Sequence, residues 1–137
     1  MWKHYALLSA FFAALTAILA KVGVRGVSGN VATAVRTVVV LFLAWGIVLF
    51  GNQMKEVREL SQANLIFLAL SGIATGLSWI FYFKALETGL VSKVAPLDKM
   101  SVVFVMLMSF LFLNEPMEWK TIAGGTLIFC GALLLAL

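Results

Sequence analysis

Long apolar runs separated by short polar connections dominate the chain. An α-helix needs about 20 residues to cross the hydrocarbon core of a bilayer, and each run is of this length. The pattern therefore predicts an all-α integral membrane bundle of five transmembrane helices, folded as a single domain over residues 1–137. The expected spans are residues 5–22, 31–50, 64–85, 92–113 and 119–137.

One arginine interrupts the apolar run at 31–50. Arg36 lies about 8 Å along this helix at the usual rise per residue, with Thr33 and Thr37 close to it in sequence. Its long side chain could extend to the membrane interface, which would leave the charge in water. It could instead face the protein interior and bind an anionic group or pair with Asp98, because charges at membrane depth are costly and usually functional. The sequence leaves both alternatives open.

A polar stripe follows the helix expected at 64–85. Its members recur every three or four residues, at Ser71, Thr75, Ser78 and Tyr82. Each hydroxyl could simply donate to a carbonyl one turn back in its own helix. Four such groups in register, with the aromatic pair Trp79 and Phe83 continuing the face, favour a polar path or pocket lining instead. We therefore expect Ser78, Trp79 and Tyr82 to line a cavity.

The run at 92–113 carries Pro96, Asp98 and Lys99 in its first half. If Ser92 caps this helix, the proline lies near the first turn, where its missing N–H costs little. If the helix begins earlier, the proline is a kink. Asp98 and Lys99 could lie at the headgroups, but we favour a buried pair, with Lys99 facing the interior and Asp98 bonded to a neighbouring helix.

Composition excludes several classes of protein. The chain is 63% hydrophobic and 12% charged, which is about half the charged fraction of a soluble domain. The net charge of +4 comes from scattered single lysines and arginines, so no nucleic-acid surface is expected. Cys130 is the only cysteine, which rules out an intrachain disulfide. With one histidine and no catalytic or nucleotide-binding motif, we expect no enzyme, metal site or cofactor.

The run KALETGLVSKVAPLDKMSVVFVMLMSFLFLNEP contains an early proline and an apolar stretch that leads to a closing glutamate, Glu115. It resembles the junction of the third and fourth helices in the EamA-like members of the drug/metabolite transporter superfamily. Arg36 and the closing run TIAGGTLIFCGALLLAL also suit the family pattern. The similarity extends over almost the whole chain.

The resemblance implies that this chain is one half of a transporter. The usual member is twice as long, with two five-helix halves of opposite orientation, and such halves enclose a cargo site near the midplane. We therefore expect a homodimer, antiparallel in preference to parallel, or a hetero-pair with a similar short chain. Four lysines and arginines flank the spans on each side, or six against four when Arg36 and Lys99 are counted, so charge barely fixes the orientation.

The resemblance also implies a function. We expect a multi-pass transporter of small organic solutes in the inner (plasma) membrane of a prokaryote, working by alternating access, with the lipid bilayer and the solute as its partners. The candidate cavity residues are Arg36, Ser78, Trp79, Tyr82, Asp98 and Lys99. Two positive groups favour a neutral or anionic cargo over a lipophilic cation. The alternative is a non-transporting membrane subunit that stabilises or modifies a partner membrane protein.

Overall fold

A computed structural model describes all residues from 1 to 137, and every regular element in it is a helix. The helices are α1 (Trp2–Gly23), α2 (Gly29–Phe50), α3 (Met54–Arg58), α4 (Gln62–Thr88), α5 (Val91–Asp98), α6 (Ser101–Phe112) and α7 (Trp119–Ala136). With α5 and α6 taken together as one rod, five helices are long and apolar enough to cross a membrane. The prediction of an all-α protein with five membrane-length helices is confirmed. Its organisation as a single domain stays a prediction.

The chain forms two compact units. The first, which we call the α5–α7 unit, comprises Met1–Ile18 and Thr88–Leu137. The second, which we call the α2–α4 unit, comprises Leu19–Glu87. Helix α1 contributes to both, because the division falls near its C-terminal end.

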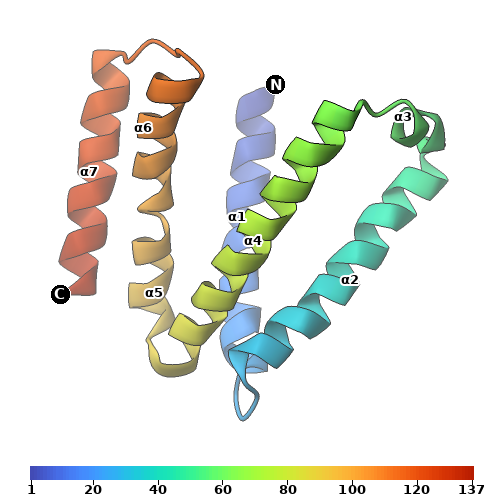
Figure 1. Cartoon of the computed structure of the whole chain (residues 1–137). Coiled ribbons are helices and arrows are strands. Elements are labelled where there is room, and N and C mark those ends of the chain that lie inside the picture. The colour runs from blue at the N-terminus through green and yellow to red at the C-terminus, as the bar shows by residue number, and fades with distance from the viewer. The chain divides into compact units, whose positions relative to one another are not determined.

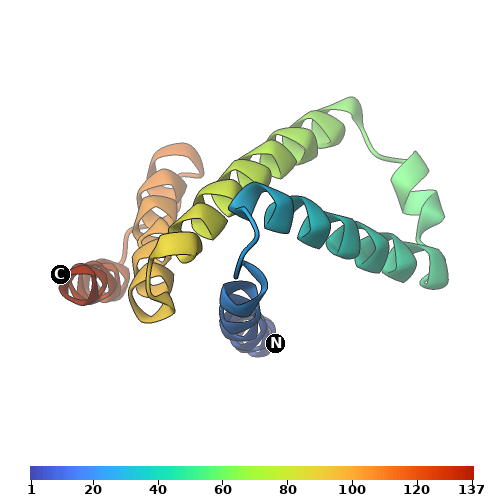
Figure 2. The same ribbon diagram turned by 90° about the horizontal axis from the view of Figure 1, so that it is seen from below.

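In the α2–α4 unit, α2 and α4 meet at one end and diverge towards the short helix α3, as both views show (Figures 1 and 2). They meet where α2 begins. A Cβ added to Gly29 would lie 3.0 Å from the backbone nitrogen of Lys84 and 3.0 Å from the carbonyl carbon of Phe83. Any larger residue would therefore push α2 away from the backbone of α4.

Two polar contacts fasten this meeting point. The carboxylate of Glu87 accepts a hydrogen bond from the backbone N–H of Gly29, in the first turn of α2. The ammonium group of Lys21 donates to the carbonyl of Leu86 at 2.5 Å. These contacts satisfy groups that every helix end leaves without an intrahelical partner, and the negative and positive charges lie at the helix ends that favour them.

In the α5–α7 unit, α7 packs against both α5 and α6. Figure 1 shows α7 running back along these two helices, so that the C-terminus lies level with α5. This unit contains the rod Val91–Phe112, which is interrupted near its middle.

Pro96 lies within α5, shortly before the interruption between α5 and α6 at Lys99 and Met100. Helix α5 begins at Val91, with Leu90 as its N-cap, so Pro96 lies inside the helix and the kink alternative holds; Ser92 is not the cap. Proline has no N–H to offer the carbonyl one turn back and crowds it. The turn that follows is tightened by bonds across three residues, from Met100 N to Leu97 O and from Val103 N to Met100 O, each 3.0 Å long.

Few side chains are buried within the chain. The buried hydrophobic residues are Ala17, Ala20, Val24, Phe83, Leu86 and Ala132. Most of the leucines, valines and phenylalanines of the long helices are exposed instead. In water this distribution would be costly, but lipid is as apolar as these side chains, so the helices suit a bilayer.

Candidate functional site

The α2–α4 unit holds a charged group on aromatic rings. The guanidinium carbon of Arg36 lies 4.2 Å from the centre of the Trp79 ring and 5.6 Å from that of Phe83. The Tyr82 and Phe83 rings meet edge to face, with centres 6.3 Å apart and planes at 90°. A cation within about 6 Å of a ring face is attracted by the negative potential of that face, which offsets part of the cost of removing the charge from water.

The guanidinium of Arg36 and the rings that it contacts lie at similar levels along their helices. Gly29 and Glu87 mark a common level, where α2 begins and α4 is about to end. Arg36 is about 10 Å along α2 from this level, and Trp79 and Phe83 are about 12 and 6 Å along α4. Whether Arg36 serves a cargo site or reaches the membrane interface stays a prediction.

No carboxylate neutralises this arginine. The ion pair of the structure joins Lys99 and Asp98, not Arg36. Glu87, the acidic residue of α4, is engaged with the N-terminus of α2. The α2–α4 unit thus carries a positive charge at span depth whose only close side-chain partners in the structure are aromatic.

The threonine hydroxyls around this site are already used within their own helices. Thr33 donates to the carbonyl of Gly29 at 2.7 Å, Thr37 to that of Thr33 at 2.8 Å and Thr75 to that of Ser71 at 2.9 Å. For Thr75, which belongs to the stripe expected along α4, the structure thus contains the local bond to a carbonyl one turn back. The oxygens of these threonines can still accept a hydrogen bond, but their donor hydrogens are occupied.

Asp98 and Lys99 form a pair of sequence neighbours at the break between α5 and α6. Their charged atoms are 3.4 Å apart, and the side chains are 35% and 57% exposed, respectively. The expectation that Asp98 bonds to a neighbouring helix is therefore wrong for this structure, because the ammonium group next in sequence takes that place. The pair belongs to the α5–α7 unit, whereas Arg36 belongs to the α2–α4 unit.

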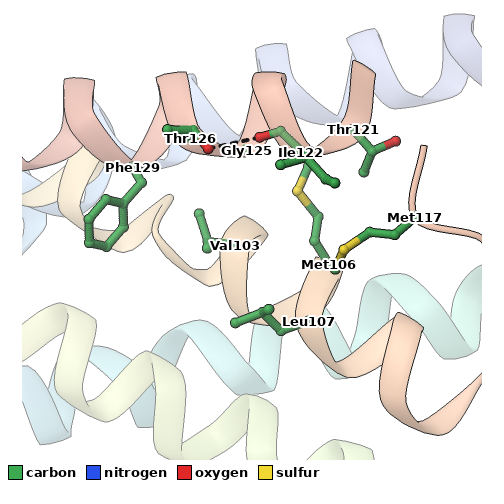
Figure 3. Close-up of a pocket in the computed structure, with 9 residues that line it drawn as sticks. All are labelled: Val103, Met106, Leu107, Met117, Thr121, Ile122, Gly125, Thr126 and Phe129. Atoms are coloured by element: carbon green, nitrogen blue, oxygen red, sulfur yellow. Dashed lines mark hydrogen bonds between the residues drawn. The ribbon is translucent and has the colours of Figure 1, made fainter. Parts of the chain in front are cut away.

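A second feature, which the sequence did not suggest, is an apolar cavity of about 370 Å³ between α6 and α7 (Figure 3). Its lining comprises Val103, Met106, Leu107, Met117, Thr121, Ile122, Gly125, Thr126 and Phe129. The sulfur of Met106 reaches Gly125 so closely that an added Cβ would lie only 2.7 Å from it. The hydroxyl of Thr126 donates a hydrogen bond to the carbonyl of Ile122 in the same helix, at 2.9 Å. The only signal in the sequence was the Gly124–Gly125 pair within an apolar run, which by itself indicates close packing and no cavity.

Comparison with known proteins identifies the family of the chain. The profile of the EamA-like transporter family matches residues 1–137, the full chain. The chain belongs to the EamA-like transporter family. It is also 48% identical, over 135 residues, to a protein of Sinorhizobium sp named "Uncharacterized transporter in cobO 3'region". The match covers 98% of this chain and 96% of that relative, so the two are of nearly equal length. No solved structure matches the chain significantly.

The six candidate side chains of this EamA-like chain fall into two groups, one in each compact unit. Arg36, Trp79 and Tyr82 come together in the α2–α4 unit, joined by Phe83. The spacing of four residues places Phe83 on the same face as Trp79, although Phe83 is not among the expected lining residues. Ser78 is exposed beside Trp79.

The second group consists of Asp98 and Lys99 and belongs to the α5–α7 unit. Whether the six side chains of this EamA-like chain share one cavity stays a prediction.

Proposed function

We propose that the chain transports small organic solutes, and that it does so by alternating access as a dimer of two five-helix halves. The observation that carries this proposal is membership of a transporter family over the full 137 residues. The near-equal length of the Sinorhizobium relative supports a short chain as the recurring unit. Transporters are commonly built from two such halves, with the cargo site at their interface near the midplane.

The arrangement of charges supports a cargo role for the α2–α4 unit. A positive charge at membrane depth costs free energy unless it is paired or faces water. Arg36 retains that charge against rings, with no carboxylate at hand. A cavity between two copies would give the guanidinium both water and a binding partner, which is the role proposed for Arg36, Ser78, Trp79 and Tyr82. We propose that Asp98 and Lys99 line the same space.

An antiparallel pair is the arrangement that we propose for the dimer. Five spans place the termini on opposite sides of the membrane. The positive residues flanking the spans are balanced, so both orientations can insert. Two oppositely inserted copies would reproduce the inverted halves of the longer transporters. We further propose that the pair resides in the inner membrane of a prokaryote, as suits the bacterial origin of the relative.

Uptake into reconstituted vesicles tests the transport proposal. Vesicles containing the purified protein would be incubated with a mixture of small metabolites, and their contents compared by mass spectrometry with those of protein-free vesicles. We expect accumulation of a chemically related subset, and its reduction at least tenfold by Arg36→Met. Vesicles that match the protein-free control for all solutes, with a second protein co-purifying in fixed ratio, would support the non-transporting subunit instead.

Labelling a single cysteine tests the proposed orientation. Cys130 would be replaced by alanine and a cysteine introduced in place of Glu115, which is exposed in the connection between α6 and α7. We expect an impermeant maleimide to label about half of the molecules in intact cells and the rest only after lysis. Labelling from one side alone would rule out mixed insertion and favour a parallel dimer or a hetero-pair.

A further inference from the structure

We propose that the cargo is a small organic carboxylate with an apolar body, and that Arg36 on the rings of α4 is its binding site. This inference rests on the proposed transport function and names the chemical class of the solute. It follows from the sign of the uncompensated charge, from the donors that the guanidinium has left, and from the rings beside it.

The uncompensated charge in the membrane-spanning helices is positive. In the α2–α4 unit, the carboxylate of Glu87 is engaged by Gly29, and Glu56 and Glu59 lie at or just after α3, outside the long helices. In the α5–α7 unit, Asp98 is paired with Lys99. No span therefore offers an unpaired carboxylate to a cationic solute. Arg36 offers an unpaired positive charge, so the membrane-spanning part of the chain favours anions.

Arg36 has more hydrogen-bond donors than the rings beside it can use. A guanidinium carries five N–H groups and accepts no hydrogen bond. The rings of Trp79 and Phe83 attract its charge, but they supply no oxygen acceptor. In a low-dielectric environment, unused charged donors are costly. A planar carboxylate can bind two of these N–H groups at once, which is a stronger and more directional contact than a single bond.

The side chains around the guanidinium favour a ligand whose remaining part is apolar. Trp79 is half-buried, and Tyr82 is half-buried one turn nearer the end of α4. The nearest threonine hydroxyls have donated their hydrogens within their own helices. The surroundings of the guanidinium thus offer aromatic surface and few free donors. An apolar ligand body fits these surroundings better than a polyhydroxylated one, whose own donors and acceptors would remain unsatisfied.

Anionic lipid is the second source of the same chemistry, because a headgroup phosphate also binds arginine. Arg36 lies about 10 Å along α2 from its start and next to rings at that depth, whereas headgroups are at the membrane surface. We therefore assign the site to a solute, and the experiment compares the two sources directly.

A fluorescence titration tests the assignment. Trp2, Trp45 and Trp119 are exposed and would be replaced by phenylalanine, leaving Trp79 as the only indole. The protein would be placed in nanodiscs of phosphatidylcholine and titrated with cyclohexanecarboxylate, with its uncharged amide and with acetate. We expect a saturable change in Trp79 emission with cyclohexanecarboxylate, at least tenfold weaker binding of acetate, and no saturable change with the amide. Equal responses to the acid and the amide would overturn the proposal.

Matched variants locate the binding. Arg36→Met should weaken cyclohexanecarboxylate binding at least tenfold, as expected for the loss of a charge-assisted bond. Arg36→Lys should give intermediate binding, because the charge remains without the planar fork. Lys84→Met removes an exposed charge from α4, the helix that carries the rings, and should leave the titration unchanged. An unchanged titration in Arg36→Met would overturn the proposal.

Two further comparisons separate the alternatives. In nanodiscs containing phosphatidylglycerol, we expect the acid to bind with nearly the same affinity. If the lipid alone reproduces the change in emission and blocks the acid, the site is a lipid site and the proposal fails. Solute uptake that survives Arg36→Met would leave the transport function standing and remove only this inference. Saturable binding without uptake of any solute would overturn the transport function instead.

Discussion

Gly29 is a residue whose small size determines how two helices meet. Its position next to the backbone of Lys84 and Phe83 leaves no room for a methyl group, and its N–H binds the carboxylate of Glu87. Arg36, about two turns further along α2, depends on this approach because the rings that it contacts belong to α4. One glycine therefore controls the geometry of the candidate anion site.

The substitution Gly29→Ala tests this dependence. The added methyl group would overlap backbone atoms that cannot rotate away, so we expect a loss of about 1–3 kcal/mol in the free energy of unfolding. Thermal unfolding in nanodiscs, together with the Trp79 emission of the single-indole protein, would measure it. Gly72→Ala is the matched control, because open space surrounds Gly72 on α4 and alanine favours a helix. Equal stability of the two variants would contradict the proposed close approach.

The pair formed by Asp98 and Lys99 permits a second test at the residue scale. If Lys99 takes part in transport, Lys99→Met should abolish uptake while membrane insertion stays normal. The double variant Asp98→Asn with Lys99→Met removes both charges and should remain inactive. Restored uptake in the double variant would indicate that each charge only neutralises the other. Lys93→Met, also exposed, serves as the control.

At the scale of the elements, the rod formed by α5 and α6 differs from the other membrane-length helices because it is interrupted. Pro96 and the tightened turn at Leu97–Val103 divide a span that would otherwise be continuous. Asp98 and Lys99, two of the three charged residues of the rod, lie at this division, whereas Lys93 lies in the first turn of α5. Interrupted helices are the usual sites of ions and substrates in transporters, since free backbone groups need polar surroundings.

Replacing Pro96 with alanine should make the rod more continuous. The new N–H can bond the carbonyl of Ser92, and removing proline from a helix interior is worth up to about 3 kcal/mol of local helix stability. We expect slower hydrogen exchange over residues 93–103 and reduced solute uptake. Leu97→Ala, which retains the proline, should preserve both properties. Unchanged exchange in the Pro96 variant would show that the packing of α7 imposes the break.

At the scale of the whole molecule, membrane-length helices with outward-facing apolar side chains dominate. The buried core is small, and the helices suit lipid or another subunit better than water. Within the α2–α4 unit, the two long helices approach each other closely at the end where α2 begins and diverge towards α3 (Figure 2). These properties are those expected of one half of a transporter, and they underlie the proposal of a dimer.

Orientation variants test the antiparallel dimer. Removing Lys55 and Arg58 would bias insertion one way, and removing Lys21 and Arg25 would bias it the other way. Each variant alone should show little uptake, because one orientation would be scarce. Co-expression of the two should restore uptake to near the normal level. High uptake by either variant alone would contradict the antiparallel arrangement and favour a parallel one.

Much of the architecture could be predicted from the sequence. Hydropathy and run length are local properties, so five membrane-length helices and the all-α class followed directly from them. The resemblance around residues 84–116 indicated the family that the full-length comparison then established. The break at Pro96 was foreseen as one of two alternatives, because proline acts on its own helix.

What surrounds each side chain was decided by the tertiary structure alone. Arg36 meets Trp79 and Phe83 across more than 40 residues of chain, and Gly29 meets Glu87 across 58. The cavity between α6 and α7 likewise depends on how Met106 lies against Gly125. Periodicity states which face of a helix a residue occupies, but which helix covers that face depends on packing between distant segments.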